Sequence, residues 1–441
     1  MITAQQKEIA RQAMDFARKE GSQQVRVSLD TATGTCFEVR DMKVDCLRRK
    51  AETALQFYLF VDGRFGAFST NRIHRDELEP FIRNAIRATR LLAQDEARTL
   101  PDPARYYRGT FPDLQSHDPA FPLLDSDAKI SLAMQACDEI TGKDSRILSA
   151  NASFEDTLEA AYLLDSNGFE AEQPAATSFS LSASVSLQDP HSPARPEDYW
   201  YHSAVHFDDL TQQGIGHEAL RRTLAKLGQS KASSGKYPML LDNTVAPHFL
   251  APLINALYGS AIQQNNSFLL NKLGGQIASP CLTLIDEPHL PRAFGARLFD
   301  GEGVATVPRT LIHKGVLQTY CIDTYYAHKL NIPPTLSSPS IPSLQKGSKG
   351  FDELLAGIDR GIRITGINGG NCNTSTGDFS YGIEGFLIEN GKPVRPLSEM
   401  NVTGNMLLLW KQLKEVGNDP LLVSSWRIPS LLFDAVDFSG S

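Results

Sequence analysis

The chain has 441 residues, of which 41% are hydrophobic and 21% are charged, a balance that is typical of folded soluble proteins and excludes a disordered chain. Its 51 acidic residues outnumber its 43 basic ones and give a formal net charge of -8. The densest basic run is the short Arg48-Arg49-Lys50, so the composition argues against a nucleic-acid-binding protein.

The first residues and the cysteines bear on the cellular compartment. The start of the chain has no apolar signal-peptide core, and no segment approaches the roughly 18 consecutive apolar residues of a membrane helix. The six cysteines are far apart and include no C-x-x-C pair, which predicts reduced thiols and neither a zinc ribbon nor a redox dithiol. We therefore expect a cytoplasmic protein without a membrane anchor.

A first α+β unit is predicted for residues 1–105. Apolar residues at helical spacing predict helices at residues 4–19 and 75–97. Alternating runs predict strands at residues 25–29, 55–60 and 65–68, with Asp62-Gly63 as a hairpin turn. A proline-rich stretch at residues 101–122 follows and is predicted to be a linker.

A middle α+β unit is predicted for residues 115–230. Helices are predicted at residues 129–141 and 213–227, and strands at residues 145–156, 159–165, 178–187 and 199–207. The order of helix, sheet and helix repeats that of the first unit, so an ancient duplication is one hypothesis.

The third unit, predicted for residues 235–441, is rich in short β-like runs punctuated by Gly, Pro and Asn. One helix is predicted at residues 247–257, and strands at residues 239–242, 282–286, 304–312, 361–367, 381–388 and 406–409. The predicted fold class is therefore α+β, with helix–antiparallel sheet–helix units followed by a β-rich C-terminal domain.

Three apparent catalytic or nucleotide-binding motifs fail on their spacing. His217-Glu218 resembles the start of H-E-x-x-H, but Arg221 stands where the second metal ligand is needed. His202 and His206 lie in an aromatic, β-branched run, and on one strand they would be about 13 Å apart, which is too far for one ion. Residues 228–237 have the wrong glycine spacing for a phosphate loop.

A polar, glycine-rich loop at residues 366–377 matches no nucleotide motif. Such a loop can present hydrogen-bonding groups to a peptide or a partner, and it can equally be a plain connection between strands. The candidate residues for contact with a peptide or partner are Asn371, Asn373, Thr374, Ser375, Thr376, Asp378 and Ser380. No G-x-S-x-G or cysteine-nucleophile signature is present.

Several segments of the third unit resemble the TldD/PmbA family, members of which have been described as modulators of DNA gyrase. The segments are residues 299–306, 309–320, 323–330, 373–380 and 382–391. The resemblance implies one of two branches. TldD-type members resemble zinc peptidases with an H-E-x-x-x-H helix and a cysteine near the C-terminus. PmbA/TldE-type members lack these ligands and pair with TldD to enclose a chamber for unfolded peptides.

The family motif falls on residues that cannot hold zinc. Placed on the helix after the strand at 239–242, it puts Ala251 and Ala256 at the histidine positions and Pro252 at the glutamate position. None of the three can donate an electron pair to a metal or accept a proton from water. The third ligand would fall near residues 416–420, yet no cysteine follows Cys372.

The resemblance therefore implies a metal-free TldE/PmbA-like subunit without catalytic residues or a cofactor of its own. Zinc is expected only in a TldD-type partner, and the substrate is expected to be unfolded peptide. For the chain alone, a homodimer is left as an open alternative. Two alternatives stay open. One is an autonomous peptidase with relocated ligands such as His248, His289 or His313, and the other is a gyrase or toxin–antitoxin modulator acting by protein binding.

Proline inside a helix costs about 3 kcal/mol, so the helix is expected to begin or kink at Pro252.

Overall fold

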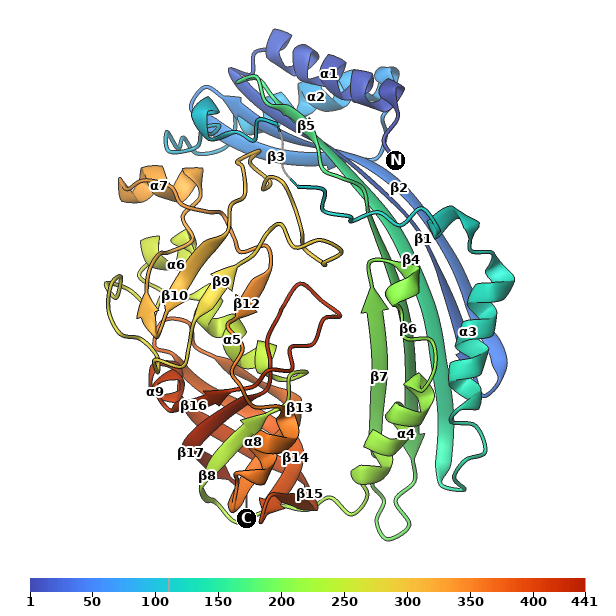
Figure 1. Cartoon of the computed structure of the whole chain (residues 1–441). Coiled ribbons are helices and arrows are strands. Elements are labelled where there is room, and N and C mark those ends of the chain that lie inside the picture. The colour runs from blue at the N-terminus through green and yellow to red at the C-terminus, as the bar shows by residue number, and fades with distance from the viewer. Residues whose placement is uncertain (110–111, 441) are drawn as a thin grey trace.

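The computed structural model describes residues 1–109 and 112–440. A long curved sheet arches over a β-rich C-terminal unit (Figure 1). The predicted α+β class, with antiparallel sheet and helices first and a β-rich unit last, is confirmed. Residues 110 and 111 of the predicted linker at 101–122 lie outside the described residues, and its flanking parts contain two short 3-10 helices, Pro103–Arg105 and Phe121–Leu123.

The curved sheet is antiparallel, with strand order β3-β2-β1-β4-β6-β7 and β5 beside β4. Its strands are β1 (Gln24–Arg40), β2 (Lys43–Val61), β3 (Arg64–Thr70), β4 (Ile147–Asp165), β5 (Glu170–Glu172), β6 (Ala176–Leu187) and β7 (Glu197–Ala204). The pairing of β1 with β4 runs from Arg26 opposite Asp165 to Arg40 opposite Asn151. The units predicted at 1–105 and 115–230 thus share one sheet, and their boundaries stay predictions.

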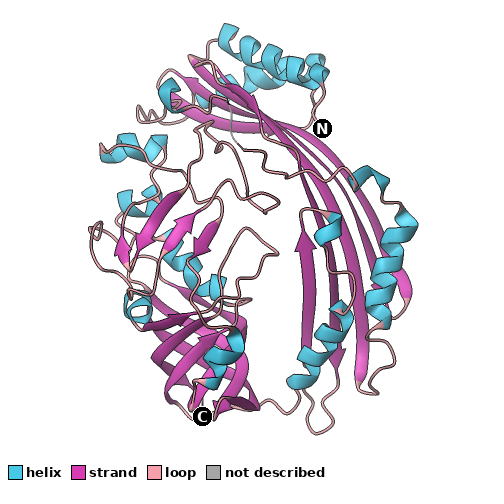
Figure 2. Ribbon diagram, viewed as in Figure 1, coloured by secondary structure: helices cyan, strands magenta, loops and turns pink. Residues whose placement is uncertain are grey.

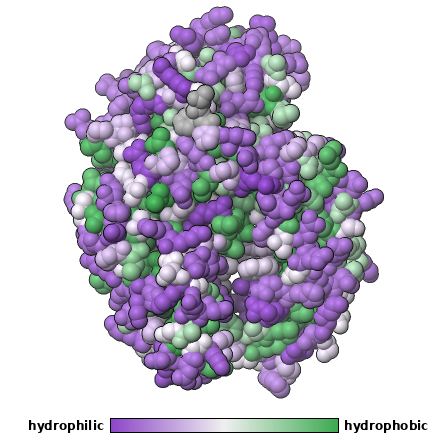
Figure 3. All heavy atoms as spheres, in the orientation of Figure 1, coloured by the Kyte–Doolittle hydropathy of each residue, from purple (hydrophilic) through white to green (hydrophobic). Residues whose placement is uncertain are grey.

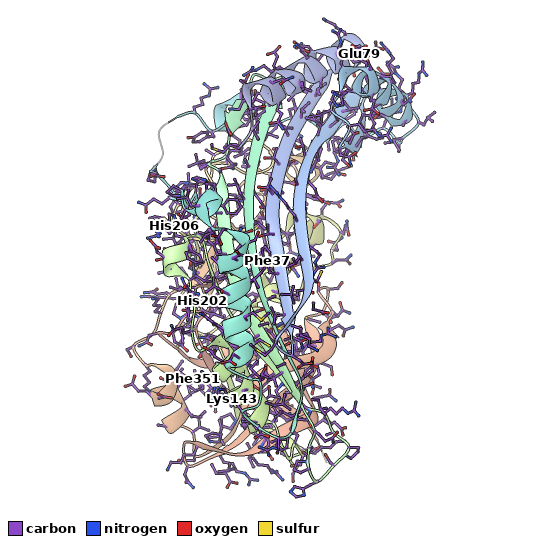
Figure 4. The ribbon with its side chains drawn as sticks, turned by 90° about the vertical axis from the view of Figure 1, so that its right-hand side faces the viewer. Phe37, Glu79, Lys143, His202, His206 and Phe351 are labelled. Carbon is purple, nitrogen blue, oxygen red and sulfur yellow. The ribbon has the colours of Figure 1, made fainter. Side chains whose placement is uncertain are left out.

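Four helices cover one face of this sheet, which Figure 4 views with α3 in front. They are α1 (Ala4–Lys19), α2 (Arg75–Thr89), α3 (Ser126–Asp138) and α4 (Ile215–Ala225). α1 begins at a capping box between Thr3 and Gln6. The strand residues that face the helices form two apolar cores, one under α1 and α2 and the other under α3 and α4. Among residues 1–109 and 112–440, no helix packs on the opposite sheet face.

The C-terminal unit contains two further sheets (Figure 2). The larger has strand order β15-β14-β13-β8-β17-β16, and an extra pairing of β15 with β17 closes part of it on itself. Its strands are β8 (Gly235–Leu241), β13 (Arg360–Cys372), β14 (Asp378–Glu389), β15 (Lys392–Asn405), β16 (Leu413–Val416) and β17 (Leu431–Ser439). The smaller sheet, in order β11-β10-β9-β12, consists of β9 (Leu284–Asp286), β10 (Arg309–His313), β11 (Val316–Leu317) and β12 (Pro342–Leu344).

Short helices complete the unit: α5 (Ala246–Asn255), α6 (Gly259–Gln263), α7 (Thr324–Leu330), α8 (Phe351–Ala356) and α9 (Met406–Lys411). The side chains of α5 and of both sheets share the largest apolar core of the molecule. On the face shown in Figure 3, by contrast, hydrophilic residues predominate and hydrophobic ones are scattered.

Several predicted elements are wrong in kind or extent. Residues 406–409 were predicted as a strand but begin α9, because the Asn405 side chain accepts a hydrogen bond from the amide of Leu407 and caps a helix there. The helix predicted at 75–97 ends at Thr89. The two strands predicted at 145–156 and 159–165 are one strand, β4.

Candidate functional site

The helix α5 carries Ala251, Pro252 and Ala256, the residues predicted to stand at the ligand and base positions of the family motif. Ala251 is half-buried, while Pro252 and Ala256 are buried. Hydrocarbon side chains therefore occupy all three predicted positions, and Ala256 packs into the largest apolar core. This arrangement cannot bind a Lewis acid or activate a water molecule.

Pro252 lies inside the helix rather than at its start. The helix begins at Ala246, after Asp242 accepts hydrogen bonds from the amides of Val245 and Ala246, and it continues past Pro252 to Asn255. The expectation that the helix would begin at Pro252 is therefore wrong. Its ring is buried, and its missing amide leaves one hydrogen bond of the helix unmade.

The histidines proposed as relocated ligands are not gathered into a metal site. His248 and His313 are exposed, and His289 lies 3.1 Å from the hydroxyl of Thr306 through its Nε2 atom. Burial lowers the pKa of His289. Within residues 1–109 and 112–440, no group of three or more His, Cys, Asp or Glu side chains is placed to hold a metal ion.

The other histidine motifs have structural partners. Glu218 accepts two hydrogen bonds from the guanidinium of Arg221, at 2.7 and 2.6 Å, so this carboxylate is already paired. His202 lies on β7 and accepts a hydrogen bond from the amide of Thr211. The strand ends at Ala204, and His206 lies beyond it with its Nε2 atom 2.8 Å from the carbonyl of Gln115 (Figure 4). The strand predicted at 199–207 was therefore too long at its C-terminal end.

The loop predicted at residues 366–377 is only in part a loop, because residues 366–372 belong to β13 and pair with β14, and the remainder forms the tip of the hairpin between these strands. Asn373 accepts a hydrogen bond from the amide of Ser375, and Asn405 donates to the carbonyl of Thr376 and to the carboxylate of Asp378. These contacts fix the turn, and the hydrogen bond from Asn405 lowers the pKa of Asp378. Most of the candidate side chains are exposed: Asn371, Asn373, Ser375, Thr376, Asp378 and Ser380, with Thr374 half-buried. Their contact role stays a prediction.

The segment at residues 299–304, which carries part of the family resemblance, joins the C-terminal unit to the curved sheet. Phe299 packs edge-on against Phe169, and its carbonyl accepts a hydrogen bond from Gln173. Glu302 accepts hydrogen bonds from the amide and hydroxyl of Thr324 at the start of α7. Burial raises the pKa of Glu302. This segment therefore has a structural role at the junction between the two parts.

A cavity of about 590 Å³, with both polar and apolar lining, lies between that junction and the helix-free face of the curved sheet. Side chains from β1, β2 and β4, among them Asp30, Gln56 and Glu159, line it together with Arg297 of the C-terminal unit. Further along the same face, hydroxyl groups pair across the strands at Ser153 with Ser182, Thr157 with Ser178, and Ser180 with Ser203. The alternating serines of β6 were visible in the sequence, but their shared face was not predicted.

A second cavity, of about 480 Å³, lies between the smaller sheet and the segment that joins β16 to β17. This segment extends toward the curved sheet in Figure 1. It is tied to the chain just before α5, because Asn243 donates a hydrogen bond to the carbonyl of Asp419. We name this space the Arg427 cavity, after the one arginine among its lining residues, which no sequence motif marked.

Comparisons with known proteins agree with this architecture. The family model described as the PmbA/TldA metallopeptidase central domain matches residues 119–227, and that of the C-terminal domain matches residues 234–440. The metalloprotease PmbA of Escherichia coli O157:H7 is 28% identical over 418 residues, which cover 94% of this chain and 92% of the relative. A PmbA homolog of Haemophilus influenzae is 27% identical over 455 residues, which cover 100% and 98%.

Comparison with solved structures also finds similar proteins. A protein of Bacteroides thetaiotaomicron, described as an assumed modulator of DNA gyrase, superposes with a TM-score of 0.97 at 54% identity over 100% of both chains. TldE from Thermococcus kodakarensis superposes with a TM-score of 0.83 over 98% of this chain and 100% of its own, and at 18% identity this likeness shows the fold alone.

The curved sheet and the β-rich unit together define a protein built like the members of a metallopeptidase family. The chain belongs to the TldD/PmbA family. Among the described residues, no helix is both long and apolar enough to cross a membrane.

Proposed function

We propose that this chain is the metal-free, TldE/PmbA-like subunit of a TldD/TldE-type peptidase complex that degrades unfolded peptides. The observation that carries the proposal is the chemistry of α5, where Ala251, Pro252 and Ala256 occupy the ligand and base positions of the family motif. The family membership supplies the peptidase context. Zinc and catalysis would then belong to a TldD-type partner chain.

The polar face of the curved sheet supports a peptide-holding role. Its hydroxyl and carboxylate groups can form hydrogen bonds with the backbone of an extended peptide, and such contacts do not depend on the peptide's side chains. The hairpin tip with Asn373 and Asp378 is proposed to face the peptide or the partner. All six cysteines are free thiols, which supports a place for the complex in the reducing cytoplasm.

Metal analysis and co-purification test this function. The purified chain is expected to contain far less than one zinc per chain and to lack peptidase activity. A pull-down from the native host is expected to recover a chain with an intact H-E-x-x-x-H. Stoichiometric zinc together with chelator-sensitive peptidase activity in the isolated chain, lost in His248→Ala, would instead establish the autonomous enzyme.

A binding titration separates the proposed function from the gyrase-modulator alternative. The formal charge of -8 leads us to expect no salt-dependent affinity for DNA. Stoichiometric capture of gyrase or an antitoxin, without any TldD-type chain, would favour the modulator. Sedimentation of the isolated chain tests whether it forms a homodimer when alone.

A further inference from the structure

Hydrogen bonds to β12 hold the backbone of Arg427 in place, but one nitrogen of its guanidinium group lacks a hydrogen-bond partner among the described residues. Its amide donates to the carbonyl of Pro342, and its carbonyl accepts from the amide of Leu344, so β12 holds the residue in place. Its Nη1 atom is buried and has no hydrogen-bond partner in the part of the chain that the structure describes. A guanidinium nitrogen that is removed from water without a partner is costly, and such groups in native proteins call for an explanation.

The surroundings of Arg427 do not neutralise its charge fully. Burial lowers the pKa of Arg427, and the nearby Glu287 carboxylate opposes this effect only in part. Lys346, exposed at the same cavity, adds a second positive charge. A negatively charged ligand in the cavity would therefore be attracted by both cations, which Arg427 and Lys346 supply.

The rest of the cavity is suited to an apolar side chain. Ile285, Leu290, Ala293, Leu344 and Leu422 contribute most of its non-polar wall. Its volume of about 480 Å³ falls within the range of small-ligand pockets, which is about 300–1,000 Å³. Glu287 on the rim would repel a dianion such as phosphate more than a monoanion. The combination favours a single carboxylate attached to an apolar residue.

We propose that the Arg427 cavity binds a carboxylate of a peptide, with the guanidinium of Arg427 as the anion ligand and the apolar wall around the neighbouring side chain. The inference rests on the proposed function in one respect, namely that the ligand is a peptide. The carboxylate can be the C-terminal group or an acidic side chain, and the two sources share the same recognition chemistry. Arg427 would act as a binding residue without a part in bond cleavage.

Peptide binding to the isolated full-length chain tests this proposal. The probe is the fluorescein-labelled peptide Ala-Ala-Ala-Leu-Leu, measured by fluorescence anisotropy with either a free C-terminus or a carboxamide. A third probe carries the carboxamide and has Asp in place of the fourth residue. The free-acid probe is expected to bind on the order of tenfold more tightly than the carboxamide, the gain typical of a hydrogen bond to a charged group.

Variants locate the effect. Arg427→Gln is expected to abolish the difference between acid and carboxamide, and Arg427→Lys to retain part of it, because lysine keeps the charge but not the planar fork. The matched control is Arg292→Gln. Arg292 lies between two residues that line the cavity, but it is exposed, pairs with Asp209 and is not itself a lining residue. It is expected to bind like the wild-type chain. Thermal unfolding of each variant separates loss of binding from loss of fold.

Each outcome decides the inference. Tight binding of the aspartate probe as well as the free acid assigns the site to carboxylates in general, and tight binding of the free acid alone assigns it to the C-terminus. Equal binding of acid and carboxamide, no binding of any probe, or displacement by inorganic phosphate where acetate has no effect would overturn it. None of these results alters the zinc and co-purification tests of the proposed function.

Discussion

Arg363 donates two hydrogen bonds to the carboxylate of Asp242, from Nε at 2.8 Å and from Nη2 at 2.7 Å. The pair joins β13 to the end of β8, directly before the helix that carries the motif positions. Asp242 is buried and its partner is partly exposed. The bidentate contact therefore fixes the chain where α5 begins.

Removing this arginine should loosen that region. Arg363→Ala leaves the Asp242 carboxylate buried without its partner and is expected to lower the free energy of unfolding by about 2–4 kcal/mol. Arg360→Ala, at an exposed position of the same strand, is the control and should change it by less than about 0.5 kcal/mol. Urea unfolding measures both, and similar losses in the two variants would count against the assigned role.

A second ion pair lies beneath α3, where Lys129 contacts Asp156 with side-chain exposures of 8% and 0%. Asp156 also accepts hydrogen bonds from the amide and hydroxyl of Thr35. Lys129→Met is expected to cost about 3–5 kcal/mol because an uncompensated buried carboxylate remains. The exposed Lys143 (Figure 4) gives the matched variant Lys143→Met, for which calorimetry should find almost no change in Tm.

The motif positions on α5 should differ in their tolerance of histidine. Ala256 is fully buried, so Ala256→His is expected to overpack the core and to destabilise the fold by about 1–3 kcal/mol. Ala251 is half-buried, and Ala251→His should be tolerated. Thermal unfolding compares the two, and equal stability would show that the helix has room for the ligand side chains of the family motif.

Because the pKa of Glu302 is raised in the folded chain, we expect the free energy of unfolding to depend on pH. Because the folded chain raises the pKa of Glu302 above its ordinary value of 4.5, the folded state binds this proton more tightly than the unfolded state does. This contribution to stability is then present at low pH and is lost as the pH rises from 4.5 through the raised pKa. Glu302→Gln removes the titration and still accepts from Thr324.

The free energy of unfolding of Glu302→Gln is therefore expected to vary less with pH above 4.5 than that of the wild-type chain, and to be higher at pH 7. Urea titrations at a series of pH values check this. Parallel curves for the two proteins would mean that Glu302 ionises in the folded state as it does in the unfolded chain.

For some helices and strands, the local sequence was sufficient to predict both the type of element and its bounds. The helix at 4–19 was predicted with its observed bounds, because its apolar residues recur at helical spacing, and in the structure Thr3 caps its first turn. The run at 406–409 has no such spacing, and the cap at Asn405 decides its structure. Most of β1 and the first part of β2 were missed because their residues are polar on one face and only partly apolar on the other.

The candidate functional sites also differ in whether the sequence alone could predict them. The substituted motif at Ala251 and Ala256 could be placed from a linear pattern together with a family resemblance. The Arg427 cavity could not, because its walls come from β9, β12 and a segment far along the chain that the fold alone brings together. Likewise, the serine hydroxyls of β6 alternate visibly in the sequence, but their partners on β4 and β7 depend on strand order.

The pairing of β1 with β4 has a consequence for synthesis on the ribosome. β1, β2 and β3 are complete long before β4 is made, and at about 5–20 residues per second the delay amounts to seconds. During that time the nascent chain exposes one whole edge of β1, whose free amide and carbonyl groups can capture strands from other molecules. Translation products that stop before Ile147 would keep this edge permanently open and are expected to be insoluble.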